Sequence, residues 1–459
     1  MRVVPYNFLR NDPAQLFLLP PSLNEWLPSD DLAYFVRDIV GEIDLSAFYA
    51  VYREDGWGGA AHDPAVMVAL LVYAYCLGVR SSREIERACR LQVGFRVVCA
   101  NLIPDHSTIS RFRQRHQEAL KTVFTASLQL SQRAGIAKVG LVALDGTKMS
   151  SPASPRKSLS QAAIAAQVEQ MLKEAAAVDA EEDERFGEAR GDELPPGLRQ
   201  REGRRERLAA LKAEMDAEEQ AQQAAYEERL AERAERERRS GRKLTGKKPK
   251  PPQEHQDYRP PRRNLTDPES RMMATQSGPC QGYNVQAIVD EAQIILAVEV
   301  SNEATDARRL GPTLDALNAA LRQAEIAERP HRLLADAGYA TEANLVRLEK
   351  EGLDAYVATR NMRRERGSRK RRPGTPLGEM DRKVSEEPGR EIYRRRIGMV
   401  EPVFGQIKED RHIRGFMRRG LAAASSEWHL IAATHNLLKL FRHAGVRPMP
   451  PTALVPVTG

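Results

Sequence analysis

The sequence predicts an α/β fold, preceded by an all-helical region and interrupted by a charged helical insertion. In the second half of the chain, short apolar runs of strand type alternate with segments of helical period, which is typical of an α/β core. Two apolar runs end in an aspartate, Asp145 and Asp336, and a glycine follows each closely. Between them lies a long stretch dense in Glu and Arg. The predicted core is therefore assembled from segments far apart in sequence.

Composition sets the broad class of the protein. The 459 residues suffice for two or three domains with a sizeable core. Lys and Arg number 70 against 63 Asp and Glu, so the net charge of +7 is modest, and local basic clusters are more informative. The longest uncharged run, residues 64–79, is shorter than the roughly 20 residues of a membrane span, and no signal peptide opens the chain. We expect a cytoplasmic protein with no membrane partner.

The four cysteines predict no metal site. They form no Cys-x-x-Cys pair, and three lie in apolar helical context, so we expect reduced core residues in a reducing compartment. They are Cys76, Cys89, Cys99 and Cys280.

The first 135 residues are predicted to be an arm followed by a helical domain. Residues 1–61 carry several prolines among apolar residues, which favours short helices in an irregular arm whose aromatic residues belong to the core. Residues 62–135 read as a helical domain. Asp63 is the predicted N-cap of a buried helix with Pro64 at its first position, and Ser82 is the predicted cap of the next. Residues 120–134 are a predicted linking helix.

The helix that begins after Pro104 and Asp105 is a candidate DNA reader. Its small polar N-terminal residues and its arginines suit the second helix of a helix-turn-helix unit. A helical bundle with a solvated basic face explains the same pattern. The candidate DNA-binding residues here are Ser107, Arg111 and Arg113.

Residues 151–262 form the predicted insertion. Apolar residues at helical spacing predict two helices, with a break at residues 192–197. The apolar stripe is thin, so a helical hairpin or loose coiled coil is favoured over a globular domain. Residues 246–261, rich in Lys and Pro, are predicted to be an extended or disordered tether.

Residues 136–150 and 263–445 are predicted to form the α/β core, and residues 446–459 a tail. The predicted strands are residues 138–145, 283–289, 294–300, 332–336 and 355–359. The predicted helices are residues 306–327, 342–350 and 427–443. Residues 360–372 form a basic loop, either solvated or ordered by a phosphate backbone.

Three acids stand out in this core: Asp145, Asp336 and Glu401. The carboxyl end of a strand is where open α/β sheets bind ligands, and Glu401 lies in a predicted helix. Converging carboxylates bind hard divalent cations, and two such ions promote phosphoryl transfer on nucleic acids. An aspartate after an apolar run is also a common turn residue or helix cap, which is the alternative for each one.

Four segments resemble the insertion-sequence transposases of the DDE type. Residues 393–408 resemble the Tyr-Arg-Glu-Lys signature, with six residues between Glu401 and Lys408. Residues 144–148 and 335–339 resemble the two Asp motifs of that family, and residues 282–286 a segment that precedes a strand in many members. The position four before Glu401, commonly Arg, is Ile397 here, which leaves open which of the three preceding arginines takes its role.

This resemblance implies a ribonuclease-H-like core with a helix-turn-helix-like domain before it. It implies a bacterial, nucleoid-associated DNA transposase that binds terminal inverted repeats and target DNA, as a homodimer when assembled on DNA. Asp145, Asp336 and Glu401 would hold two Mg²⁺ ions, which Mn²⁺ can replace, for strand cleavage by water and strand transfer by a 3′-hydroxyl. Further DNA contacts would come from Tyr393, Arg394, Arg396 and Lys408.

Three other functions stay open at this point. A catalytically inactive or domesticated relative would bind DNA through the helical region alone. A metal-dependent nuclease would cut DNA without joining it. A coiled-coil scaffold would account for the insertion but not for the α/β core.

Overall fold

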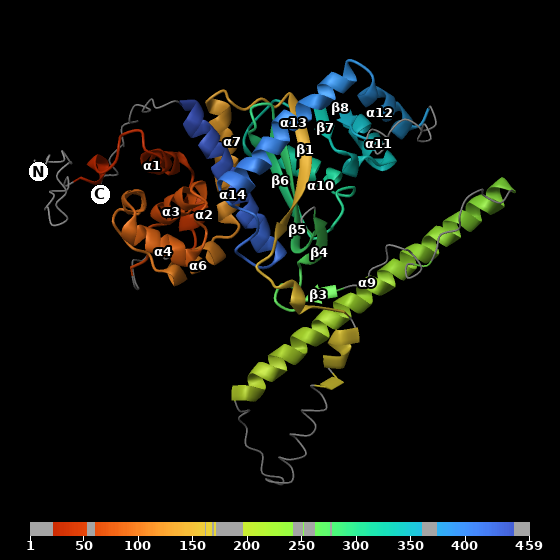
Figure 1. Ribbon diagram of the computed structural model, residues 1–459, viewed down its shortest axis with the longest axis horizontal. Helices are drawn as coiled ribbons and strands as arrows, with labels where there is room; N and C mark the ends of the chain where they lie inside the picture. Colours follow the sequence, from red (N-terminus) through yellow and green to blue (C-terminus); the bar gives the residue numbers. More distant parts are fainter. Residues whose placement is uncertain are drawn as a thin grey trace, which may run out of the picture.

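A computed structural model gives the fold of the chain (Figure 1). It describes residues 22–52, 60–160, 162–167, 169–170, 196–241, 251, 262–275, 278–359 and 374–444. The basic loop predicted at residues 360–372, the tail and most of the tether lie outside these residues, as do the arm before residue 22 and residues 171–195 of the insertion. Among the described helices, none combines the length and apolar character that crossing a lipid bilayer requires.

The chain begins with a bundle of helices. They are η1 (Leu23–Glu25), α1 (Leu32–Glu42), α2 (Ser46–Tyr49), α3 (Pro64–Cys76), α4 (Ser82–Leu91), α5 (Val93–Val98), α6 (His106–Arg115) and α7 (Ala119–Arg133). The side chain of Asp63 accepts a hydrogen bond from the backbone of Ala65 at the start of α3, which confirms the predicted cap. Among the predicted core aromatics, Phe48 is fully buried whereas Tyr49 is exposed.

The cap predicted at Ser82 is wrong by one residue. Ser81 is the N-cap of α4, without a side-chain hydrogen bond, and Ser82 is already inside the helix. The Ser82 hydroxyl accepts a hydrogen bond from Arg113 of α6 instead. A tertiary contact has therefore replaced the local capping interaction that the sequence suggested.

Within the described residues, six strands form one mixed sheet. They are β1 (Leu141–Ser150), β4 (Arg271–Thr275), β5 (Gly278–Asp290), β6 (Ile295–Ser301), β7 (Arg332–Ala335) and β8 (Asp354–Val357). The order is β4-β5-β1-β7-β8. β6 also pairs with β5, further along the strand than β4 does. β5 is antiparallel to β1, β4 and β6, whereas β1, β7 and β8 run parallel. This mixed α/β arrangement is consistent with the ribonuclease-H-like core that the resemblance implied.

Helices cover both faces of the sheet. They are α10 (Leu310–Gln323), α11 (Glu342–Lys350), α12 (Pro376–Ser385), α13 (Gly389–Gly405) and α14 (Leu421–Ala444), with the π-helical turn η6 (Gln406–Asp410) after α13. α13 contacts β1, β5, β7 and β8, and α14 lies beside it, with Phe404 stacked on Trp428. α10 contacts β5 and β6, and α11 contacts β8 (Figure 1).

One continuous apolar core joins the helical region to the sheet. α14 packs against α7 and α3 on one side and against β6 on the other (Figure 1). Fully buried residues of this core come from every layer, among them Phe48, Val142 and Trp428. The helical region and the α/β region, predicted as separate domains, thus share a single buried interior.

The described part of the insertion is a long helix with a small core of its own. α9 (Pro196–Ser240) extends away from the rest of the molecule (Figure 1). Beside it, β2 (Ser158–Ser160) pairs with β3 (Arg262–Asn264), and a separate apolar cluster joins Ile164 to Leu208, Leu211 and Met215 of α9. The structure does not confirm the predicted coiled coil, since the partner predicted for α9 lies largely outside the described residues.

Candidate active site

The first two acids of the predicted site lie directly after the last paired residues of two neighbouring parallel strands. β1 pairs with β7 as far as Leu144 opposite Ala335, so Asp145 and Asp336 are the next residue on each strand. β7 ends there, whereas β1 continues to Ser150 paired with β5, and Ser150 also forms an isolated parallel bridge with Gly415. The two carboxylates therefore meet where the parallel ladder stops, which is where α/β sheets bind ligands.

Asp336 also serves as a cap. Its Oδ1 accepts a hydrogen bond of 2.8 Å from the backbone N–H of Gly338, at the start of the 3-10 turn η4 (Ala337–Tyr339). The alternative interpretation from sequence is thus correct for one of its two oxygens. A cap and a ligand role are compatible, because a carboxylate has two oxygens with lone pairs to share.

Asp145 is mostly buried, and the environment of its carboxylate is electrostatically unusual. Arg396 of α13 donates a hydrogen bond of 2.7 Å from Nη2 to Asp145 Oδ2. Desolvation nevertheless raises the pKa of Asp145 to about 6, with a smaller contribution from the Asp336 charge, and Arg396 offsets only part of this effect. A carboxyl group whose pKa is shifted in this way by burial and by neighbouring charges is typical of functional sites.

α13 and η6 lie on β1 at two points. Arg396 reaches Asp145, and Lys408 donates to the Thr147 hydroxyl and, at 3.3 Å, to the Lys148 carbonyl. Glu401 lies between these two residues along the helix, but its side chain is exposed. The structure therefore brings Asp145 and Asp336 together and places Glu401 on the adjacent helix without a hydrogen bond or ion pair to any described residue.

α13 continues without interruption through Pro402. Proline lacks the N–H that would bond to the carbonyl of Gly398. The side chain of Gln293, from the turn between β5 and β6, donates to that carbonyl at 3.0 Å. The carbonyl is thus satisfied from outside the helix, which keeps Glu401 in regular helical geometry.

The opposite face of β1 carries a polar network. Gly146 and Lys148 lie opposite Gln286 and Asn284 of β5 in the antiparallel register. The Lys148 ammonium, the Asn284 amide and the Gln286 amide all donate to one oxygen of Asp306, a residue in the loop after β6. This network gives the motif at residues 282–286 a structural role.

Asp306 was not singled out from the sequence, which placed it only at the start of a predicted helix. The helix begins later, at Leu310, and leaves Asp306 in the loop. The available signal was the polar, turn-like composition of residues 301–306 between a strand and a helix. Composition of that kind does not say which side chain turns inward.

The predicted DNA-binding residues separate into exposed and buried groups. Ser107 and Arg111 are exposed on α6, and Arg394 is exposed on α13, whereas Tyr393 is half-buried. Arg113 is buried, with hydrogen bonds from its guanidinium to the Arg80 carbonyl at 2.8 Å and to the Ser82 hydroxyl. The expectation that Arg113 contacts DNA is therefore corrected: this side chain ties α6 to α4.

Arg396 is also buried rather than presented to solvent. Its ion pair with Asp145 occupies one terminal nitrogen, and its Nε has no hydrogen-bond partner among the described residues. Arg395, in contrast, is exposed and pairs with Glu291. Of the three arginines before Ile397, Arg396 is thus the one that contacts the acidic site.

The donor set suits a hard cation, although a complete metal site is not assembled. Asp145 and Asp336 offer carboxylate oxygens side by side, the ligand type that Mg²⁺ and Mn²⁺ prefer. Within the part of the chain that the structure describes, no three carboxylate, imidazole or thiol groups lie together as a metal site. A third oxygen ligand would have to come from a residue that moves, and Glu401 is exposed on the neighbouring helix.

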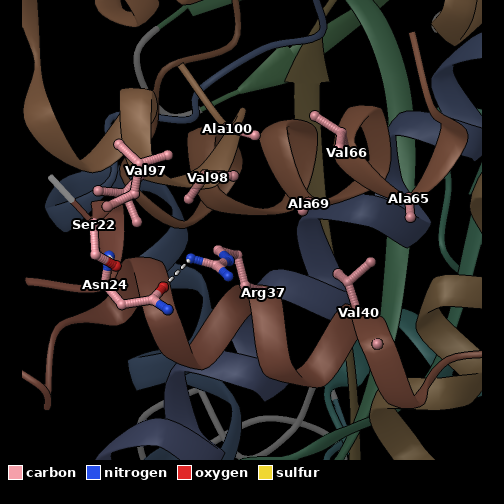
Figure 2. A pocket seen from close by; sticks show the side chains of 12 residues that line it. Ser22, Asn24, Arg37, Val40, Ala65, Val66, Ala69, Val97, Val98 and Ala100 are labelled. Atoms are coloured by element: carbon pink, nitrogen blue, oxygen red, sulfur yellow. Dashed lines mark hydrogen bonds between the residues drawn. The ribbon is translucent and has the colours of Figure 1, made fainter. Parts of the chain in front are cut away.

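A pocket of about 430 Å³ lies elsewhere, among α1, α3 and α5 of the helical region (Figure 2). Its lining is mainly apolar or small, and its single charged side chain, Arg37, donates to Asn24 at 3.0 Å. The pocket has no carboxylate in its lining. It is therefore not a candidate for chemistry on phosphate.

Two family descriptions match the chain, and no curated protein or solved structure does. A transposase domain (DUF772) matches residues 21–115, which form the helical region up to the end of α6. A transposase DDE domain matches residues 266–437, which run from the strand after the insertion into α14. β1 and Asp145 fall between the two matches. Because both matches are to transposase domains and together span the helical region and most of the sheet, the chain belongs to the insertion-sequence transposases of the DDE type, enzymes of phosphoryl transfer on DNA.

Proposed function

We propose that this transposase binds the terminal inverted repeats of its element and performs both strand cleavage and strand transfer at Asp145, Asp336 and Glu401. The observation that carries the proposal is the position of Asp145 and Asp336, each one residue past the end of the ladder between β1 and β7. An enzyme that cuts and then joins with one site needs no second catalytic centre. It needs only that water and a DNA 3′-hydroxyl occupy the same place in turn.

The three carboxylates would hold the divalent ions that DDE domains generally use. Bound Mg²⁺ or Mn²⁺ would activate the attacking oxygen and stabilise the leaving oxygen. Asp145 and Asp336 would supply fixed oxygens from the strand ends, and Glu401 a third from α13. Because Glu401 is exposed, its side chain can turn toward the site without breaking a hydrogen bond or ion pair to a described residue.

Residues of α13 and of η6, which follows it directly, would hold the DNA backbone. Lys408 forms no ion pair among the described residues, and it reaches β1 only two residues past Asp145. Its ammonium is thus available for a phosphate near the scissile bond. Tyr393 and Arg394, one helical segment earlier, would extend this contact. Arg396 would act through Asp145, to which it donates its hydrogen bond.

Recognition of the terminal repeats would belong to the helical region. Ser107 and Arg111 are exposed on the first turns of α6. Two copies of the chain, one at each end of the element, would bring the ends together as a homodimer on DNA.

The test compares Asp145→Asn, Asp336→Asn and Glu401→Gln with the parent on one terminal-repeat duplex. Each variant keeps side-chain shape but removes ligand charge, so each should nearly abolish nicking and joining. Gel shifts should be unchanged, because α6 lies apart from the acids. Combined variants should lose no more than single ones, since the acids act as a unit. Parent-like nicking by all three variants would refute the proposed site, and nicking without joining by the parent would indicate a nuclease.

A further inference from the structure

The carboxylate of Asp306 accepts hydrogen bonds from two strands of the sheet next to the proposed site. Its Oδ1 accepts hydrogen bonds from Lys148 Nζ at 3.0 Å, Asn284 Nδ2 at 2.8 Å and Gln286 Nε2 at 3.1 Å. These donors belong to β1 and β5, whereas Asp306 belongs to the loop before α10. One of these three donors, the Lys148 ammonium, is charged, so the hydrogen bonds hold the carboxylate firmly against both strands.

The network continues from Asp306 to the turn that carries Asp336. Gln286 accepts a hydrogen bond at Oε1 from the Tyr339 hydroxyl, and Tyr339 is fully buried at the end of η4. The Gln286 side chain passes over Gly146 on the way. A Cβ at Gly146 would lie 2.5 Å from Gln286 Nε2, so any larger residue there would displace the Gln286 amide from its hydrogen bonds. Asp306, Gln286 and Tyr339 thus form a continuous strut.

The strut begins where the backbone ladder stops. Up to Leu144 and Ala335, hydrogen bonds between β1 and β7 fix the spacing of the two strands. Asp145 and Asp336 are the first residues beyond that ladder. From there on, the strut connects the Asp336 turn to β5 and, through Lys148, to β1. The Asn344 amide also ties this turn to the loop of Asp306, through hydrogen bonds to the Tyr339 and Ala307 carbonyls.

We propose that Asp306 is a positioning residue for strand cleavage, which acts through Gln286 and Tyr339 to hold Asp336 in register with Asp145. This inference rests on the proposed function of the two aspartates. Asp306 does not contact the reacting atoms in this role. Its ion pair with Lys148, whose side chain is 15% exposed, adds a charged donor to the amide donors of Asn284 and Gln286.

Metal affinity is the property that distinguishes positioning from a general structural role. Residues that orient metal ligands typically change affinity by about 10- to 100-fold when altered. Binding of Mn²⁺ to the DNA-free chain can be followed by electron paramagnetic resonance, independently of activity. Asp306→Asn should raise the half-saturating Mn²⁺ concentration by about tenfold or more. The half-saturating Mg²⁺ concentration for nicking should rise by a similar factor, with gel shifts unchanged.

Tyr339→Phe provides a second, milder variant. It removes only the hydroxyl that reaches Gln286 and keeps the buried ring, so it tests the strut even if Asp306→Asn fails to fold. Its effect on Mn²⁺ affinity should have the same direction, and the double variant should lose little more than Asp306→Asn alone. Asp315→Asn, on an exposed carboxylate of α10, is the matched control and should bind Mn²⁺ as the parent does.

Three outcomes would overturn the inference. Unchanged Mn²⁺ affinity in folded Asp306→Asn or Tyr339→Phe would remove Asp306 from the positioning role while leaving the catalytic proposal intact, provided that Asp145→Asn does lose affinity. Additive losses in the double variant would show that the two residues act separately. If neither the parent nor Asp145→Asn binds Mn²⁺ on or off DNA, the proposed metal site fails and the inference falls with it.

Discussion

Asp145→Asn should stabilise the metal-free protein at alkaline pH. The folded chain raises the pKa of Asp145 from 3.8 to about 6, so the folded state binds this proton more tightly than the unfolded state does. Ionisation at pH 8 therefore costs stability, by about 3 kcal/mol at 1.36 kcal/mol for each pKa unit. The side chain is only 19% exposed, so solvent screening is limited. The amide oxygen left by the substitution can still accept the Arg396 hydrogen bond.

The stabilisation expected for Asp145→Asn depends on pH. Below about pH 4 Asp145 is protonated in both states, so the parent and the variant should unfold alike. The gain should appear between about pH 4 and pH 6 and be complete above that range. Urea unfolding in EDTA at pH 4 and pH 8 measures it, with Asp315→Asn as the exposed control. A gain that is absent at pH 8, or equal at both pH values, would refute the reasoning.

Three other predictions follow from the geometry. Gly146→Ala should lower the free energy of unfolding by about 1–3 kcal/mol and slow nicking, because the new Cβ displaces Gln286; a parent-like urea midpoint would contradict this. Lys408→Ala should reduce the salt dependence of terminal-DNA binding by about one counterion, and an unchanged slope in a salt titration with normal cleavage would make Lys408 a structural residue. Replacing residues 161–261 with a short linker should preserve cooperative unfolding of the core, since α9 packs on a separate cluster; a broadened or multiphasic transition would show otherwise.

The positions of Asp145 and Asp336 could be predicted because the signals are local. An apolar run of strand length that ends in aspartate indicates the strand, and for β7 it also marks the carboxyl end. Two parallel strands then bring their ends together without further information. The Asp63 cap was predictable for the same reason, since capping involves only neighbouring residues.

Other features depend on contacts that no local pattern records. β1 runs on to Ser150, past the predicted end at Asp145, because β5 pairs with its polar half. Arg113 lies on a helix whose composition suggests DNA binding. Its guanidinium instead donates hydrogen bonds inside the protein, to the carbonyl of Arg80 and the hydroxyl of Ser82. Whether a basic side chain faces solvent or the interior is decided by the packing of α4 on α6, which the sequence alone does not give.

The alternation of side chains along β1 separates the proposed chemistry from its support. Asp145 and Thr147 face α13 and η6, where Arg396 and Lys408 meet them. Gly146 and Lys148 face the other side of the sheet, toward Asp306. Since successive side chains of a strand point to opposite faces, one short segment can present a ligand on one surface and anchor it from the other. A polar strand end of this kind fixes the position of a carboxylate, which is what the proposed metal-dependent site requires.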